Sequence, residues 1–177
     1  MKRLIAILLL LLLAVSLVAC GDDDVTDGMK NVAPENAKFY FYVPETWLEQ
    51  EGNICGALSP RGDATDTFRA NVIVTTYIAD TYYSPKSYWE EKCKKDYEAV
   101  LSELVVVEGD CKDTTMGGMN AYQMVFTHKI GADTYKQLQV IAVDNNMVYT
   151  LQYTAKLADY DTNLEDVESI RAKFTLR

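Results

Sequence analysis

The residue types with the greatest capacity for chemistry in this chain are four cysteines and a single histidine. A Ser-His-Asp or Cys-His catalytic site could be built only on His128, which follows Met124-Val125-Phe126-Thr127 in a predicted strand. No nucleophile-elbow sequence lies near it, so we predict that His128 is structural or on the surface. Zinc would need clustered cysteine and histidine ligands, and neither an HExxH motif nor paired CxxC motifs occur. The sequence therefore predicts no catalytic residue, no metal site, no cofactor and no enzymatic activity.

Cys20 follows a basic start and a long apolar run. Met1-Lys2-Arg3 is a short basic segment, and residues 4–19 are apolar except for Ser16. As a helix this run would span about 24 Å, short of the ~30 Å hydrocarbon core, which favours a signal peptide over a permanent transmembrane helix. It ends in Leu17-Val18-Ala19-Cys20-Gly21, which resembles the lipobox of bacterial lipoproteins. The resemblance implies cleavage before Cys20, a diacylglycerol on its thiol and acylation of the new amine, and so a stable membrane anchor. An ordinary secretory signal with a chance cysteine is the alternative.

Three cysteines, Cys55, Cys93 and Cys111, remain once Cys20 is lipidated. Outside the cytoplasm they permit at most one internal disulfide, with three possible pairings and one thiol left over. Cys93 falls on the apolar stripe of a predicted helix, where a thiol packs as a small apolar group. The sequence leaves the pairing open and gives no reason to expect redox activity.

Three further motifs suggest ligand binding but have simpler explanations. Asp159-Tyr160-Asp161-Thr162-Asn163 begins like a calcium loop, yet Leu164 and Ile170 stand where that loop needs glycine and glutamate. We interpret this segment as a helix cap. Arg61-Gly62-Asp63 matches the tripeptide that integrins recognise, and we expect a plain polar loop there. Tyr82-Tyr83, in the loop before a long predicted helix, are weak candidates for ligand binding.

The chain beyond the signal peptide (residues 1–19) is strongly acidic. It has 15 basic and 26 acidic side chains, a formal charge of −11. Such a chain repels nucleic acid and anionic lipid headgroups, so we expect no nucleic-acid partner. Residues 20–37 hold Asp22-Asp23-Asp24 and Pro34 among few large apolar side chains, which predicts a flexible acidic tether behind the lipidated cysteine. Residues 38–177 are long enough for a single domain with one core.

The first elements of this domain follow from apolar periodicity. Lys38–Val43 carries aromatic side chains on both faces, which predicts a strand covered on both sides and ended by Pro44. Residues 53–58 and 69–78 predict two more strands. A helix is predicted to begin at Ser84-Pro85, with serine as N-cap and proline as first residue. Its apolar residues recur every three or four positions, at Trp89, Cys93, Tyr97, Val100, Leu101 and Leu104.

The second half of the domain predicts mostly strands. One continues from about residue 105 to 113, and a meander follows at 120–129, 134–143 and 147–155, joined by short turns that tolerate positive φ. Thr162-Asn163-Leu164-Glu165 has the form of a capping box. The helical stripe after it consists of Leu164, Val167, Ile170 and Phe174. This order predicts an α+β fold with a central antiparallel sheet flanked by helices.

Five segments of the domain resemble the PsbP family, whose founding members are extrinsic subunits of photosystem II. They are Phe39–Trp47, Ala70–Val74, Gly117–Tyr122, Met147–Ala155 and Ile170–Phe174. The Ran-binding Mog proteins and many bacterial lipoproteins share the fold of this family. The resemblance covers residues 37–177 and implies an α/β/α sandwich with a central antiparallel sheet. It supplies no catalytic signature, because the family is known mostly for protein partners.

These observations favour a membrane-anchored extracytoplasmic lipoprotein domain of non-catalytic type. Its partners would be the membrane, through the lipid anchor, and an unidentified extracytoplasmic protein or small ligand. The alternative is a solute- or metal-capturing accessory of a transporter. One domain of this size argues against that alternative, because most solute receptors have two lobes.

Overall fold

The computed structural model describes residues 28–50, 55–60 and 68–177. The expected signal peptide, Cys20 and Arg61-Gly62-Asp63 lie outside the described residues. Within those ranges, no helix is both long enough and apolar enough to cross a membrane.

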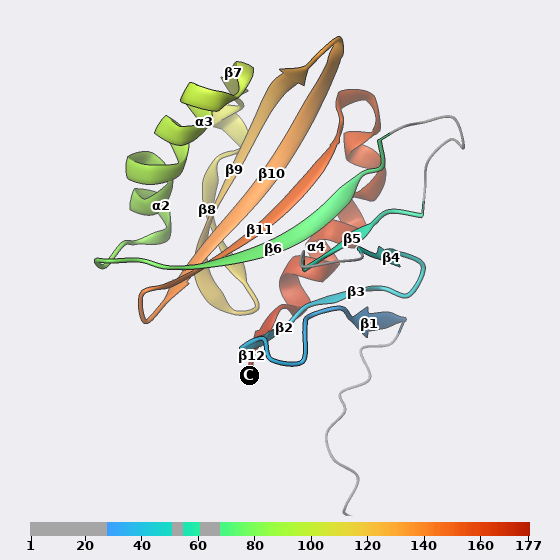
Figure 1. Cartoon of the computed structure of the whole chain (residues 1–177), viewed down its shortest axis with the longest axis vertical. Helices are drawn as coiled ribbons and strands as arrows, with labels where there is room; N and C mark the ends of the chain where they lie inside the picture. The colour runs from blue at the N-terminus through green and yellow to red at the C-terminus, as the bar shows by residue number, and fades with distance from the viewer. Residues whose placement is uncertain (1–27, 51–54, 61–67) are drawn as a thin grey trace, which may run out of the picture.

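An antiparallel sheet of eight strands forms the centre of the molecule (Figure 1). Seven of its strands follow one another in space in the order β4 (Leu48–Glu49), β5 (Gly56–Leu58), β6 (Asn71–Ile78), β11 (Met147–Lys156), β10 (Asp133–Asp144), β9 (Met119–Ile130) and β7 (Ser102–Val106). The eighth strand, β8 (Lys112–Met116), pairs with another part of β9. The predicted meander is confirmed as β9, β10 and β11, each within two residues of its expected ends. Gly131, Asn145 and Asn146 make its turns with positive φ.

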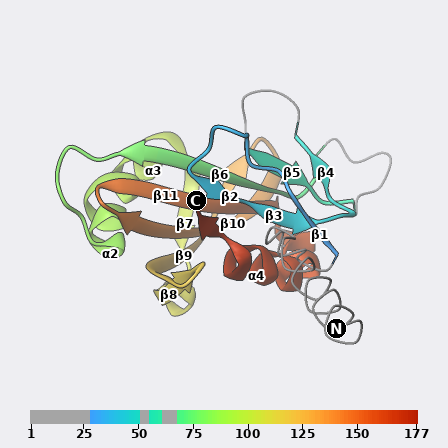
Figure 2. The same cartoon turned by 90° about the horizontal axis from the view of Figure 1, so that it is seen from below.

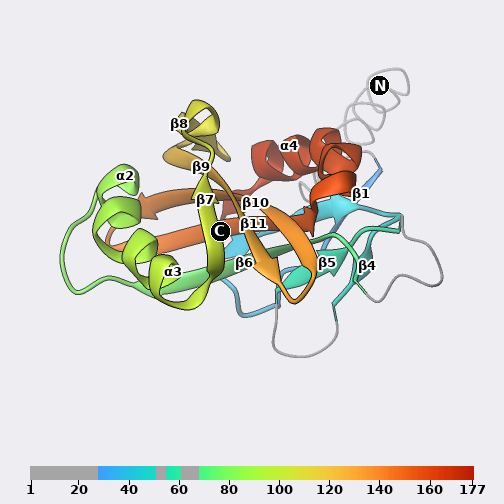
Figure 3. The same cartoon turned by 90° about the horizontal axis from the view of Figure 1, so that it is seen from above.

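Helices pack on both faces of this sheet, which gives the expected sandwich (Figure 3). On one face, α2 (Pro85–Tyr88), a π-helical turn (Trp89–Cys93) and α3 (Lys94–Val100) form one continuous helix. The other face carries α4 (Leu164–Lys173), which follows a 3₁₀ segment (Leu157–Asn163). We call these the α2–α3 face and the α4 face.

The core is divided between the two faces because side chains alternate along each strand. Tyr149, Leu151 and Tyr153 of β11 point to the α4 face, where the larger cluster also holds Trp47 and Phe174. On the α2–α3 face a smaller cluster is made by seven buried residues. They are Ala79, Tyr83, Trp89, Met124, Phe126, Ile141 and Val148.

The N-terminal strands differ from the prediction in two ways. Val32 is buried and Met29–Asn31 forms β1, which pairs with β3 (Tyr42–Pro44), so the expected tether is wrong beyond Gly28. The expected single strand is split, because β2 (Phe39–Tyr40) pairs with β12 (Thr175–Leu176) and β3 with β1. Its side chains alternate between buried and half-buried, so only one side is covered. Figure 2 shows these strands beside α4 and the end of the sheet.

Both helix predictions need a correction at one end. Ser84 is the N-cap with a capping box to Ser87, as expected at that end, but α3 ends at Val100 and Leu104 lies in β7. The chain leaves the helix because pairing of β7 with β9 satisfies its backbone groups instead. Val100 is consequently exposed. The predicted capping box with Thr162 as N-cap is also wrong, because Asn163 is the N-cap of α4 and its side chain makes no capping hydrogen bond.

Gly117 in the β8–β9 turn is required by its surroundings. Its φ is +55°, and a Cβ there would lie 1.7 Å from the carbonyl oxygen of Phe174. Its amide N–H donates to the carbonyl of Arg171 at 3.0 Å. The close approach joins the end of α4 to the sheet, which only a residue without a side chain permits.

Candidate functional site

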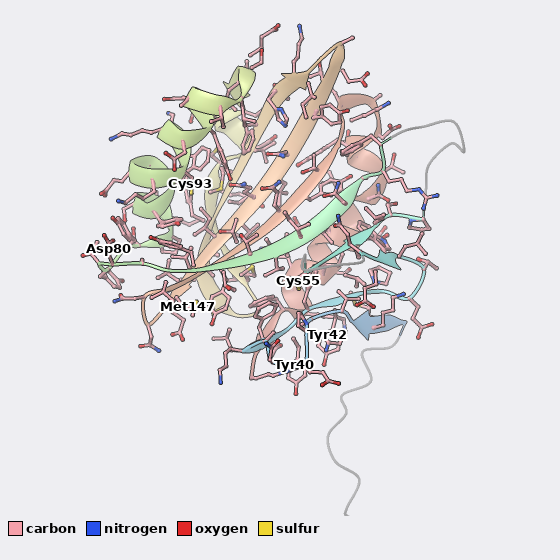
Figure 4. All side chains as sticks on the ribbon, in the orientation of Figure 1. Tyr40, Tyr42, Cys55, Asp80, Cys93 and Met147 are labelled. Atoms are coloured by element: carbon pink, nitrogen blue, oxygen red, sulfur yellow. The ribbon has the colours of Figure 1, made fainter. Side chains whose placement is uncertain are left out.

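A cleft of about 590 Å³ runs along the outer edge of β6. One side is the edge itself, from Ile73 to Thr76, and the other is the segment from Pro34 to Phe39. Met147 and Tyr149 of β11 form its base, and Cys55 closes one end. Figure 4 shows Cys55 and Met147 between β6 and the N-terminal strands. We call this the β6 cleft, and its volume falls within the roughly 300–1,000 Å³ range of ligand pockets.

The edge of β6 beside this cleft is only half covered. β5 pairs with the first three residues of β6, and the Val74 amide N–H donates to the Cys55 carbonyl at 2.8 Å. No described strand pairs with the outer edge from Thr75 to Ile78. Tyr77 and Ile78 expose 57% and 71% of their surface. Unpaired backbone groups therefore face the solvent beside an apolar hollow.

Cys55 places an unreactive thiol at the end of the β6 cleft. Burial raises the pKa of the Cys55 thiol to about 11, and the charge of Glu49 adds to the effect. The thiolate is the nucleophilic form, so almost none is present at neutral pH. Burial likewise raises the pKa of Cys93 to about 11 on the α2–α3 face. Cys55, Cys93 and Cys111 are all free thiols, and no pairing allowed by the sequence is formed.

Polar side chains gather on the part of the α2–α3 face that lies beyond the helix. The Gln139 amide donates to Gln152 Oε1 at 2.7 Å and to the Tyr97 hydroxyl. Gln137 donates to the Thr154 hydroxyl at 3.1 Å. The Gln139 side-chain oxygen is buried, and no described residue donates a hydrogen bond to it. This cluster bonds mostly to itself.

His128 is structural, as predicted, and lies buried on the α2–α3 face. Its ring stacks on Tyr135 with centroids 5.8 Å apart and lies 6.3 Å from Phe126. Neither ring nitrogen has a hydrogen-bond partner among the described residues, so no carboxylate or nucleophile is joined to it there. Burial lowers the pKa of His128, which keeps the ring neutral at pH 7.

The two weak tyrosine candidates are separated by the structure. Tyr83 is buried against Tyr88 in an edge-to-face contact, with centroids 5.5 Å apart, so it is a core residue and not a ligand contact. Tyr82 is exposed, and it does not line the β6 cleft. The two side chains therefore do not share one surface.

The calcium-like segment lies in the 3₁₀ helix before α4. Tyr160 is buried there, and Asp161 borders a smaller hollow of about 420 Å³ with Glu165 and Glu168. No group of three or more His, Cys, Asp or Glu side chains in the described ranges is placed to hold a metal ion.

The β6 cleft was missed by sequence reasoning because its sides come from distant segments. The signal that could have found it is the run Thr75-Thr76-Tyr77-Ile78, which has high strand propensity. It carries no lysine, proline or bulge to protect an edge.

The chain is thus an α+β sandwich whose described pockets include a cleft at a sheet edge. No protein family and no curated protein matches its sequence. Solved structures do match its fold. LpqN of Mycobacterium tuberculosis, involved in cell envelope biogenesis, is 17% identical with a TM-score of 0.58, over 84% of this chain and 90% of that one.

Two other structures extend the comparison. The PsbP (CyanoP) of Synechocystis is 12% identical with a TM-score of 0.52, over 92% of this chain and 99% of that one. The Ran-binding protein Mog1p of Saccharomyces cerevisiae is 11% identical with a TM-score of 0.56, over 84% and 95%. The chain therefore has the PsbP-like fold, as the resemblance implied.

Proposed function

We propose that this chain is a lipid-anchored extracytoplasmic domain that binds a partner without catalysis and does so in the β6 cleft. The observation that carries the proposal is the cleft itself, a mostly apolar hollow next to uncovered strand edge. Aromatic and aliphatic lining with a few polar groups is typical of binding sites. The sole histidine, His128, is buried against aromatic rings, and this environment does not suit acid–base catalysis.

The structural relatives are compatible with a binding role outside the cytoplasm. Mog1p is a Ran-binding protein, and LpqN is involved in cell envelope biogenesis. Neither partner is transferred to this chain, because fold kinship alone does not assign function. What the relatives support is a domain whose surface binds other molecules.

A photo-reactive amino acid in place of Thr76 tests the cleft as the binding site. The intact lipoprotein is irradiated in its own membranes, and a variant with the same group at Val100 is the matched control. Val100 is 75% exposed and lies on α3, across the sheet from the cleft. We expect a discrete crosslinked product from position 76 alone. Equal yields from both positions, or none from position 76, would contradict the proposal.

The anchor is tested separately by Cys20→Ser. We expect the variant to leave the membrane fraction or to accumulate as an unprocessed precursor, because the acceptor thiol for the lipid is gone. Fractionation and the mass of the mature protein measure this. Unchanged membrane association together with unchanged processing would show that Cys20 is not lipidated.

A further inference from the structure

We propose that the β6 cleft takes an extended, basic peptide segment of a partner protein, which adds as a strand to the outer edge of β6. This inference rests on the proposed function of the cleft as the binding site and names the class of occupant. In strand addition, main-chain hydrogen bonds supply the affinity and alternate side chains supply the specificity.

The direction of the backbone groups supports pairing at this edge. The Val74 N–H points outward to Cys55, whereas the Ala79 N–H points inward to the Asn146 carbonyl at 2.8 Å. Because backbone groups alternate along a strand, the N–H and C=O groups of Thr76 and Ile78 also point outward. The four residues from Thr75 to Ile78 offer about 13 Å of edge, enough for a segment of four or five residues.

The shape of the cleft favours a single strand over the edge of another sheet. The segment from Pro34 to Phe39 stands across the cleft from β6 and bounds it on the far side. A lone peptide strand needs only about 4.8 Å beside its neighbour, so it requires less room than the edge of a second sheet. In a second copy of this chain, β6 has its own segment from Pro34 to Phe39 beside it, so two such edges would collide.

The lining and the charge define the chemistry of the peptide. Side chains on one face of an added strand would point into the hollow that Phe39, Met147 and Tyr149 line, which calls for apolar residues at alternate positions. The other face would be open to water. Lys38 is the charged side chain of the lining, so the attraction for a basic segment comes from the field of the whole chain, whose formal charge beyond residue 19 is −11, and not from the lining itself.

The probe is a synthetic pentapeptide, acetyl-KVTVK-amide, added to the intact lipoprotein in detergent. We expect saturable binding and at least tenfold slower hydrogen exchange at the amides of Thr76 and Ile78. Two N-methylated peptides test the backbone hydrogen bonds between the peptide and β6. One is methylated at both valine nitrogens and the other at the threonine nitrogen. Only one set of amides can face β6, so one pattern should weaken binding at least tenfold and the other should not.

Protein variants complete the test. Thr76→Pro removes an outward N–H, which an edge tolerates, and should weaken binding at least tenfold. Thr76→Val keeps that N–H and should weaken binding much less than Thr76→Pro does. No saturable binding, or equal effects of the two methylation patterns, would overturn strand addition. If crosslinking from position 76 succeeds while the peptide test fails, the cleft remains the binding site and only its occupant is wrong.

Discussion

The two faces of the central sheet differ in whether their buried polar groups have hydrogen-bond partners. On the α4 face, the Tyr153 hydroxyl donates to the Tyr160 carbonyl at 2.8 Å, and Ser59 donates to Asn163 Oδ1 at 2.9 Å. The Trp47 indole N–H donates to Asp166 of α4 at 2.9 Å. On the α2–α3 face, the Gln139 oxygen and both nitrogens of His128 are buried without a partner among the described residues.

This difference shows which face holds the fold together. A buried polar group without a partner costs about 1–3 kcal/mol, whereas a satisfied one contributes about 1 kcal/mol. Two hydrogen bonds of the α4 face, Ser59 to Asn163 and Trp47 to Asp166, join segments more than a hundred residues apart. We infer that the α4 face is the more stabilising side and that the α2–α3 face tolerates change. The predictions below test that contrast.

The largest effect is expected from Trp47→Ala. Trp47 is fully buried and hydrogen-bonded to Asp166, so truncation leaves a cavity and removes a tie to α4. We expect a loss of about 3–5 kcal/mol in the free energy of unfolding. Trp89→Ala on the α2–α3 face is the matched control and should cost less, because its ring stacks on Phe126 of β9 but has no described hydrogen bond to a distant element. Denaturant unfolding measures both, and an equal or larger cost for Trp89→Ala would contradict the contrast.

A smaller effect is expected from replacing the buried amides. Asn163→Leu removes the acceptor that Ser59 uses and the amide beside Tyr153, so we expect a loss of about 1–3 kcal/mol. Gln139→Leu removes the amide that donates to Gln152 and Tyr97, but it also removes a buried oxygen without a described donor. Losing that unpaired oxygen offsets part of the loss, so we expect a cost of about 1 kcal/mol or less. The urea concentrations at the unfolding midpoints of the two variants, each relative to the parent, measure the two losses. A greater loss for Gln139→Leu would show that the α2–α3 face is not the tolerant one.

The smallest effect is the pH dependence that His128 confers. Burial lowers its pKa below the ordinary value near 6.5, so the unfolded chain takes up the proton first as the pH falls. Stability from the neutral ring is present above pH 6.5 and is lost from there down to the lowered pKa, by at most about 1.4 kcal/mol per pH unit. In His128→Phe, the free energy of unfolding should change less between pH 5 and 7 than it does in the parent. An unchanged slope in that variant would place the titrating group elsewhere.

Prediction from sequence succeeded where the signal is local. Ser84-Pro85 begins a helix because serine caps and proline fits the first turn, and neither property depends on distant residues. The meander was predictable because its turns demand positive φ and its strands alternate. The same reasoning failed after Val100, because the apolar spacing continues to Leu104 although the helix ends at Val100.

The β6 cleft and the contacts of single tyrosines could not be predicted in this way. Tyr82 and Tyr83 are adjacent and alike in sequence, yet only Tyr83 is buried, because it alone meets Tyr88. The cleft joins residues near 36, 55, 75 and 148, which no local pattern connects.

The acidic charge, the start of the long helix, the three-strand meander and the α+β fold class could be predicted from the sequence. Each of these depends on composition or on spacing within one segment. Only the tertiary structure decided that residues 29–32 join the fold, that the first aromatic strand is shared between two small sheets, and that β6 keeps half of its outer edge open. Those features depend on which distant segment satisfies each backbone group, and long-range pairing leaves little trace in local sequence.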